Sequence, residues 1–176
     1  MVDIATIETE RLVLRAHCLE DFDAYHALWS DPSVVRYIGG TPSTVEQTWA
    51  RLIKAAGHWH HLGFGFLAIE EKDSGALIGE AGFHEVKRAM TPSIIGTLET
   101  GWLLAPQYQG RGYAREAMRA LISWGEQRFP SKSMTAIIHP ANDSSLKLAH
   151  KLGFQEVTRT DYNGDVILLE RPSSRG

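Results

Sequence analysis

Residues 101–129 constrain the fold more than any other part of the chain, because a strand, a glycine-rich turn and a helix follow one another there. An apolar run ends at Pro106, and the turn 109–114 precedes a long helical pattern. Gly110 and Gly112 allow backbone dihedrals that other residues avoid and let the main chain approach a ligand closely. The following helix presents unpaired N–H groups and the positive end of its dipole. This unit predicts a site for a phosphate or diphosphate.

Two common phosphate motifs do not match the turn. A nucleoside-triphosphate loop needs Gly-Lys followed by Ser or Thr, but Gly112 is followed by Tyr113. A dinucleotide fingerprint needs a third glycine where this chain has Arg115. The turn therefore belongs to another class of phosphate site.

The turn resembles the acetyl-CoA loop of the GNAT N-acetyltransferase superfamily, whose signature is Gln or Arg, two residues, Gly, one residue, then Gly or Ala. Gln109, Gly112 and Ala114 match this signature. A second segment, residues 142–154, begins with Asn-Asp-Ser-Ser and ends with Lys-Leu-Gly-Phe, where the family has a similar pattern. The resemblance implies that acetyl-CoA is the cosubstrate and that a primary amine accepts its acetyl group.

Two further features resemble the branch that includes the ribosomal-protein N-terminal acetyltransferases RimJ and RimL. They are the opening run at residues 9–15 and Glu99 just ahead of the Gly-Trp pair at 101 and 102. The resemblance therefore spans roughly residues 8–171.

Composition agrees with one domain over residues 1–176, since 43% of the 176 residues are hydrophobic and no linker interrupts them. The net charge of −3 comes with scattered Lys and Arg, which argues against a nucleic-acid partner. The lone Cys18 excludes an internal disulfide, and the N-terminus lacks the pattern of a signal peptide, so we expect a cytoplasmic protein. No apolar run approaches the ~20 residues that span a bilayer.

Hydrophobic periodicity predicts strands and helices in a mixed order. A helix over 44–60 should bury Val45, Trp49, Leu52 and Ile53, and Asp31 with Pro32 should end the first helix. The strand order predicts one α/β or α+β domain whose helices cover a mixed sheet. The resemblance implies a mostly antiparallel sheet with helices on both faces, whose middle strands splay apart near residues 105 and 139 around the pantetheine arm. The expected strands are 11–16, 64–71, 76–85, 98–105, 133–139, 154–160 and 166–171; the expected helices are 19–29, 44–60, 113–129 and 142–152, and 86–96 is an irregular loop.

Acetyl transfer to an amine needs a free lone pair on that amine, and Glu99 is our candidate for the general base. Burial on the central strand should raise the proton affinity of its carboxylate. The family resemblance points to the same residue. The alternative is an ordinary strand glutamate that faces solvent or forms an ion pair.

The thioester carbonyl and the departing thiolate need partners too. Backbone N–H groups at positions 102–104 could polarise the carbonyl. In the family, a hydroxyl or amide near the start of the penultimate helix often serves the thiolate, and Asn142 and Ser145 occupy that place. Asn142 could equally be only a helix N-cap. The general acid stays unassigned, since no tyrosine lies between Tyr113 and Tyr162.

The expected site therefore has two parts. The candidate catalytic residues are Glu99, Asn142 and Ser145. No metal is expected, because His58, His60 and His61 have no carboxylate or cysteine framework around them. His84 closes a strand and could face the substrate, but a lone histidine at a strand end is more often structural. The candidate acetyl-CoA-binding residues are Trp102, Leu103, Leu104, Gln109, Gly110, Arg111, Gly112, Tyr113, Ala114 and Asn142.

The acceptor is left open by the sequence. A protein N-terminal amine, a polyamine, an amino sugar and an amino acid all remain possible, and acetyl transfer would proceed by direct attack in a ternary complex. The alternative function is a non-catalytic domain that binds acyl-CoA as a sensor or interaction module. A homodimer is plausible.

Overall fold

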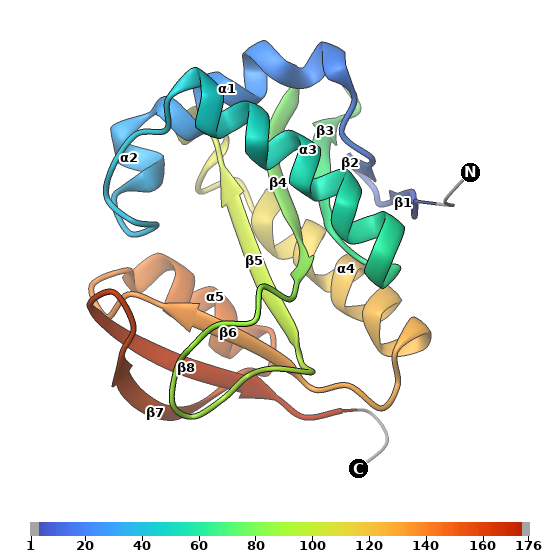
Figure 1. Ribbon diagram of the computed structural model, residues 1–176. Coiled ribbons are helices and arrows are strands. Elements are labelled where there is room, and N and C mark those ends of the chain that lie inside the picture. The colour runs from blue at the N-terminus through green and yellow to red at the C-terminus, as the bar shows by residue number, and fades with distance from the viewer. Residues whose placement is uncertain (1–3, 174–176) are drawn as a thin grey trace.

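The computed structural model describes residues 4–173, and its centre is one eight-stranded sheet (Figure 1). The strand order is β1-β2-β3-β4-β5-β6-β8-β7, and every neighbouring pair is antiparallel except β5 with β6. The predicted mixed, mostly antiparallel sheet is therefore confirmed. The strands are β1 (Ile7–Glu8), β2 (Leu12–Arg15), β3 (Phe66–Glu71), β4 (Leu77–His84), β5 (Leu98–Leu104), β6 (Met134–Ile138), β7 (Gln155–Asp161) and β8 (Asp165–Arg171).

Helices cover both faces of this sheet, as expected. In Figure 1 the N-terminal helices α1 to α3 lie in front of it, and α4 and α5 lie behind it. The helices are α1 (Phe22–Ser30), α2 (Pro32–Val35), α3 (Val45–Leu62), α4 (Tyr113–Arg128) and α5 (Asp143–Lys151), with short 3₁₀ turns η1 (Leu19–Asp21) and η2 (Pro106–Tyr108).

Strands β5 and β6 pair over only two residues. Leu98 is opposite Met134 and Glu99 is opposite Thr135, after which the strands diverge (Figure 1). The splay that the resemblance implied is therefore present. It leaves the β6-facing edge of β5 without a strand partner from residue 100 onward.

Two elements were not predicted, β1 and α2. The expected stop at residues 31 and 32 does end α1 at Ser30, but a new helical turn starts at once. The carboxylate of Asp31 accepts a hydrogen bond from the N–H of Ser33 at 2.8 Å, and Pro32 takes the first helical position. A proline fits there because that N–H has no intrahelical partner in any case.

The predicted buried face of α3 was largely wrong. Val45, Trp49 and Ile53 are 56%, 45% and 50% exposed. Leu52 is buried as expected, and the other buried residues of the helix are Thr48, Ala55 and Trp59. The inward face contains the small Ala55 and the hydroxyl-bearing Thr48, and a search for large apolar residues at helical spacing does not detect either of them. The Thr48 hydroxyl is satisfied by the carbonyl of Thr44 and the ring of His26.

The central strands tolerate no side chain at Gly82. A Cβ there would lie 2.3 Å from Cα of Phe66 and 2.5 Å from the carbonyl oxygen of Gly65. Both contacts are with the backbone of the adjacent segment at the start of β3, so the sheet itself would have to move. Gly57 on α3 is different, because a Cβ there meets nothing within 4 Å.

We expect Gly82→Ala to lower the free energy of unfolding by about 1–3 kcal/mol or more, the usual effect of overpacking. The control Gly57→Ala should raise it by roughly 0.5–1 kcal/mol, because alanine restricts the unfolded chain and favours helix. Urea denaturation of both variants measures the two effects. Equal stabilities would show that the β3–β4 spacing is not as tight as described.

Candidate active site

The glycine-rich turn is built as the sequence predicts. Gly110 and Gly112 have φ values of +74° and +82°, a region that favours glycine. Gly112 caps α4, and no side chain caps the first turn of that helix. The amide of Gln109 donates to the carbonyl of Leu104 at 3.0 Å and so ties the turn to the end of β5. The first N–H groups of α4 are therefore free of side-chain caps and available to an anion.

Tyr113 and Ala114 face the protein rather than the turn. The Tyr113 side chain is buried, its hydroxyl hydrogen-bonds to Glu71, and the Arg11 guanidinium lies 4.3 Å from its ring centroid. Ala114 packs against the main core. Only the backbone N–H groups of these two residues can therefore serve a ligand. Arg111 is exposed and points over Tyr108 at 5.8 Å.

The other arm of the splay ends at α5, where Asn142 is a helix cap. Its Oδ1 accepts from the N–H of Ser145 at 3.2 Å and from the hydroxyl of Ser144 at 3.1 Å. The capping alternative is thus realised. Within residues 4–173, neither the Asn142 Nδ2 nor the Ser145 hydroxyl makes a hydrogen bond, so both keep a free donor.

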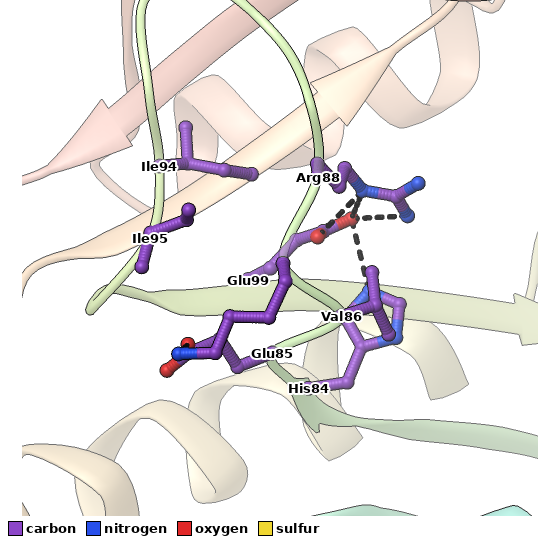
Figure 2. A pocket seen from close by; sticks show the side chains of 8 residues that line it. His84, Glu85, Val86, Arg88, Ile94, Ile95 and Glu99 are labelled. Carbon is purple, nitrogen blue, oxygen red and sulfur yellow. Dashed lines mark hydrogen bonds and ion pairs between the residues drawn. The ribbon is translucent and has the colours of Figure 1, made fainter.

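Glu99 is buried on β5, with 6% of its surface exposed, and two residues bind its carboxylate. Arg88 donates from Nε at 2.7 Å to one oxygen and from Nη2 at 2.7 Å to the other, and Nε2 of His84 lies 2.9 Å from Oε1 (Figure 2). Burial alone would raise the pKa of Glu99, but the hydrogen bonds and charges of His84 and Arg88 outweigh it and hold the pKa below its ordinary value. The expected upward shift was therefore wrong.

His84 and Arg88 belong to the candidate site, although neither is among the catalytic residues expected from the sequence. The sequence favours a structural role for His84, yet His84 pairs with Glu99 across β4 and β5, and its ring lies 5.2 Å from the ring of Phe66 between centroids. Arg88 comes from the loop after β4 and also donates to the Tyr162 hydroxyl at 3.2 Å, from the turn between β7 and β8. A strand-register argument could have found His84; no local pattern singles out Arg88.

These side chains line a small pocket between the end of β4 and the following loop. Figure 2 shows Arg88 reaching across Glu99, with Ile94 and Ile95 on the returning limb of the loop. Among residues 4–173 no group of three or more His, Cys, Asp or Glu could hold a metal ion. The described helices include none that is long and apolar enough to cross a membrane.

The family model of the acetyltransferase (GNAT) domain matches residues 11–155. The chain belongs to the GNAT acetyltransferase family. This GNAT chain is 32% identical to an uncharacterized N-acetyltransferase, p20, from Bacillus licheniformis over 86% of its own length and 83% of that protein. The family transfers an acetyl group from acetyl-CoA, so the enzyme class expected from the sequence is confirmed.

Solved structures agree with this assignment. A protein from Bordetella pertussis described as a GNAT-family acetyltransferase superposes with a TM-score of 0.85 at 33% identity, over 95% of this chain and 99% of that one. The ribosomal-protein α-N-acetyltransferase RimL, in complex with coenzyme A, superposes with a TM-score of 0.80 over 98% of this GNAT chain and 100% of its own. Its identity is 18%, so it supports the fold alone.

The lowered pKa of Glu99 predicts how pH changes stability. A carboxylate whose folded pKa is depressed stabilises the protein above its unfolded pKa, and this contribution is lost as pH falls through the folded pKa. We expect the stability advantage of the wild type over Glu99→Gln to shrink as pH drops below the ordinary value of 4.5. Denaturant midpoints measured from pH 7 to 3 check this. The control is Glu46→Gln, an exposed residue of α3, for which a much flatter difference is expected.

Proposed function

We propose that this GNAT chain acts as one catalytic domain and transfers an acetyl group to a primary amine by direct attack in a ternary complex. The observation that carries the proposal is the layout of β5. Glu99 lies where β5 parts from β6, the unpaired edge follows, and the glycine-rich turn comes after Leu104. At about 3.3 Å per residue, Glu99 and Leu104 are roughly 17 Å apart along the strand.

The donor fits this layout in three places. The N–H groups at the start of α4, with Gly110, Arg111 and Gly112, would hold the diphosphate of acetyl-CoA. Gln109 would keep the turn at the end of β5. The free edge at residues 102–104 would pair with the amides of the pantetheine arm as an added strand and polarise the thioester carbonyl. Side chains there, Trp102 included, should matter less than the backbone.

The acceptor must lose a proton before or during attack. At pH 7 this deprotonation costs about 4.6 kcal/mol for a lysine of pKa ~10.4 and about 1.4 kcal/mol for an α-amine of pKa ~8. Both Glu99 oxygens are already bound, so we propose that Glu99 and His84 act together. An ionised Glu99 holds the proton of His84 on Nε2 and leaves Nδ1 as the lone pair that takes the amine proton.

The thiolate leaves towards the start of α5. The Ser145 hydroxyl and the Asn142 Nδ2 are the free donors on that arm, and one hydrogen bond from either would stabilise the developing negative charge. A cytoplasmic location and a homodimer stay predictions from the sequence.

Acetyl-CoA at about 100 times its dissociation constant should stabilise the wild type by ~2.7 kcal/mol, or roughly 5–10 °C in melting temperature. Gly112→Glu should abolish the shift, because it places a strained, negative side chain in the phosphate turn. Gly75→Glu is a matched control, since Gly75 also has a positive φ, +67°, and lies in the β3–β4 turn. A shift that survives in Gly112→Glu would place the donor elsewhere.

Glu99→Gln should lower kcat by about 10²–10⁴, the usual contribution of general base catalysis, while the acetyl-CoA shift persists. His84→Asn should lower kcat by a similar factor if the two residues act as one base. An active His84→Asn would assign the proton transfer to Glu99 alone. Donor binding without turnover on any amine would instead favour the binding-only alternative.

A further inference from the structure

One face of α3 brings basic side chains near the end of β4 that carries His84. Arg51, Lys54 and His58 are three and four residues apart, so they lie along one side of the helix. The Arg51 guanidinium sits 3.8 Å from the ring centroid of Trp29. The His58 ring lies 6.2 Å from the ring of His84, and its Nε2 is 3.3 Å from the carbonyl of Glu85.

Lys54 lies between these two residues and belongs to the same electrostatic neighbourhood as Glu99. Partial burial and the positive charges of Arg51 and Arg88 lower its pKa, while Glu99 opposes that shift. Arg88 and Lys54 thus both interact with the Glu99 carboxylate, which can neutralise only one of them, and Arg51 adds a third positive charge next to Lys54.

The nearby carboxylates, Glu99, Glu80 and Glu85, have other partners, and Glu85 pairs with Lys87. Glu99 is bound by Arg88. Glu80 accepts from the Tyr25 hydroxyl at 3.0 Å and the Trp29 Nε1 at 3.1 Å beneath α1. Within residues 4–173, Arg51 and Lys54 have no ion-pair partner at all. Two cations without an ion-pair partner beside the proposed site are a feature that a substrate must accommodate.

This charge has two effects on an acceptor. It disfavours a bound ammonium ion and so favours the neutral amine, which is the reactive form. It also repels an acceptor with several amines, such as a polyamine, and attracts one that carries its own anion. Residues 51 and 54 are separated by about 4.5 Å of helix rise, so both side chains can reach one small anionic group.

We propose that the acceptor is an amine with a carboxylate or phosphate a few bonds from its nitrogen, and that Arg51 and Lys54 bind this anion. The amine then points to His84 and Glu99, beside the free edge of β5. The proposal rests on the proposed acetyl transfer and narrows its substrate class. A free amino acid, an amino phosphate and a peptide with an acidic first residue share this chemistry.

Initial-rate kinetics with matched acceptors test it. The pairs are phenylalanine with phenylalanine amide, phosphoethanolamine with ethanolamine, and a short peptide beginning with Asp with its Asn counterpart. We expect at least a 10-fold higher kcat/KM for the anionic member of one or more pairs, expressed mainly in KM. The pair with the largest ratio of kcat/KM values shows whether the anion is an amino-acid carboxylate, a phosphate or an acidic peptide side chain. Phenylalanine amide has a more easily deprotonated amine than phenylalanine, so amine protonation cannot produce a preference for phenylalanine.

Variants of α3 separate the anion site from the chemistry. Lys54→Met and Arg51→Met should bring the ratio of kcat/KM for the anionic acceptor to kcat/KM for its neutral partner towards 1. Lys54→Glu should bring this ratio below 1. Arg128→Met removes an exposed cation from the C-terminal end of α4, on the other face of the sheet, and should keep the wild-type ratio. Retention of the acetyl-CoA melting shift in every variant confirms an intact fold and donor site.

Binding gives a readout that does not need turnover. In the presence of coenzyme A, the anionic acceptors should raise the melting temperature of the wild type more than their neutral partners, and Lys54→Met should lose this difference. Turnover that treats both members of every pair alike, or equal melting shifts, would overturn the anion site and leave acetyl transfer standing. Absence of turnover with every amine, together with anion-dependent melting shifts, would overturn the proposed function and leave the anion site standing.

Discussion

The early end of pairing between β5 and β6 is the constraint on which the rest of the structure depends. Buried backbone N–H and C=O groups need partners, and a strand edge that loses its neighbour in the middle of a sheet leaves several unsatisfied. The two strands meet at only two positions, yet both run on to the helices that hold the glycine-rich turn and Asn142. In the proposed complex the pantetheine arm pairs with the β5 edge and completes the sheet, so donor binding and sheet completion would be one event.

Much of the fold was predictable because local chemistry determines it. Turn residues mark the element ends: the Asn163-Gly164 pair adopts positive φ values of 55° and 116° between β7 and β8, as a hairpin turn requires. The glycine-rich turn was predictable for the same reason. The buried face of α3 was not, because Thr48 is buried through its hydrogen bond to His26 of α1, whereas Trp49 meets Phe22 of α1 edge-on and stays 45% exposed. A two-residue strand such as β1 carries no periodicity to detect.

The site was predictable only in part, because its partners come from distant segments. Glu99 could be placed on the central strand, but the direction of its pKa shift depends on Arg88, which lies in an irregular loop 11 residues earlier. Burial alone gives the opposite sign. The basic face of α3 could not be predicted either, because the sequence does not show that α3 crosses the sheet (Figure 1) and brings Arg51 to Trp29 and His58 to His84.

The same cations act on both partners of the proton transfer. Arg88 lowers the proton affinity of Glu99, so the carboxylate stays ionised and can orient His84, whose Nδ1 takes the amine proton in the proposed transfer. The positive charge of Arg51, Lys54 and Arg88 also lowers the proton affinity of an amine held beside them. Proton transfer is efficient when donor and acceptor are matched, and a lower proton affinity of the amine brings it closer to that of an imidazole. A cation-rich site around a single carboxylate is therefore compatible with base catalysis, provided that the acceptor brings the missing negative charge.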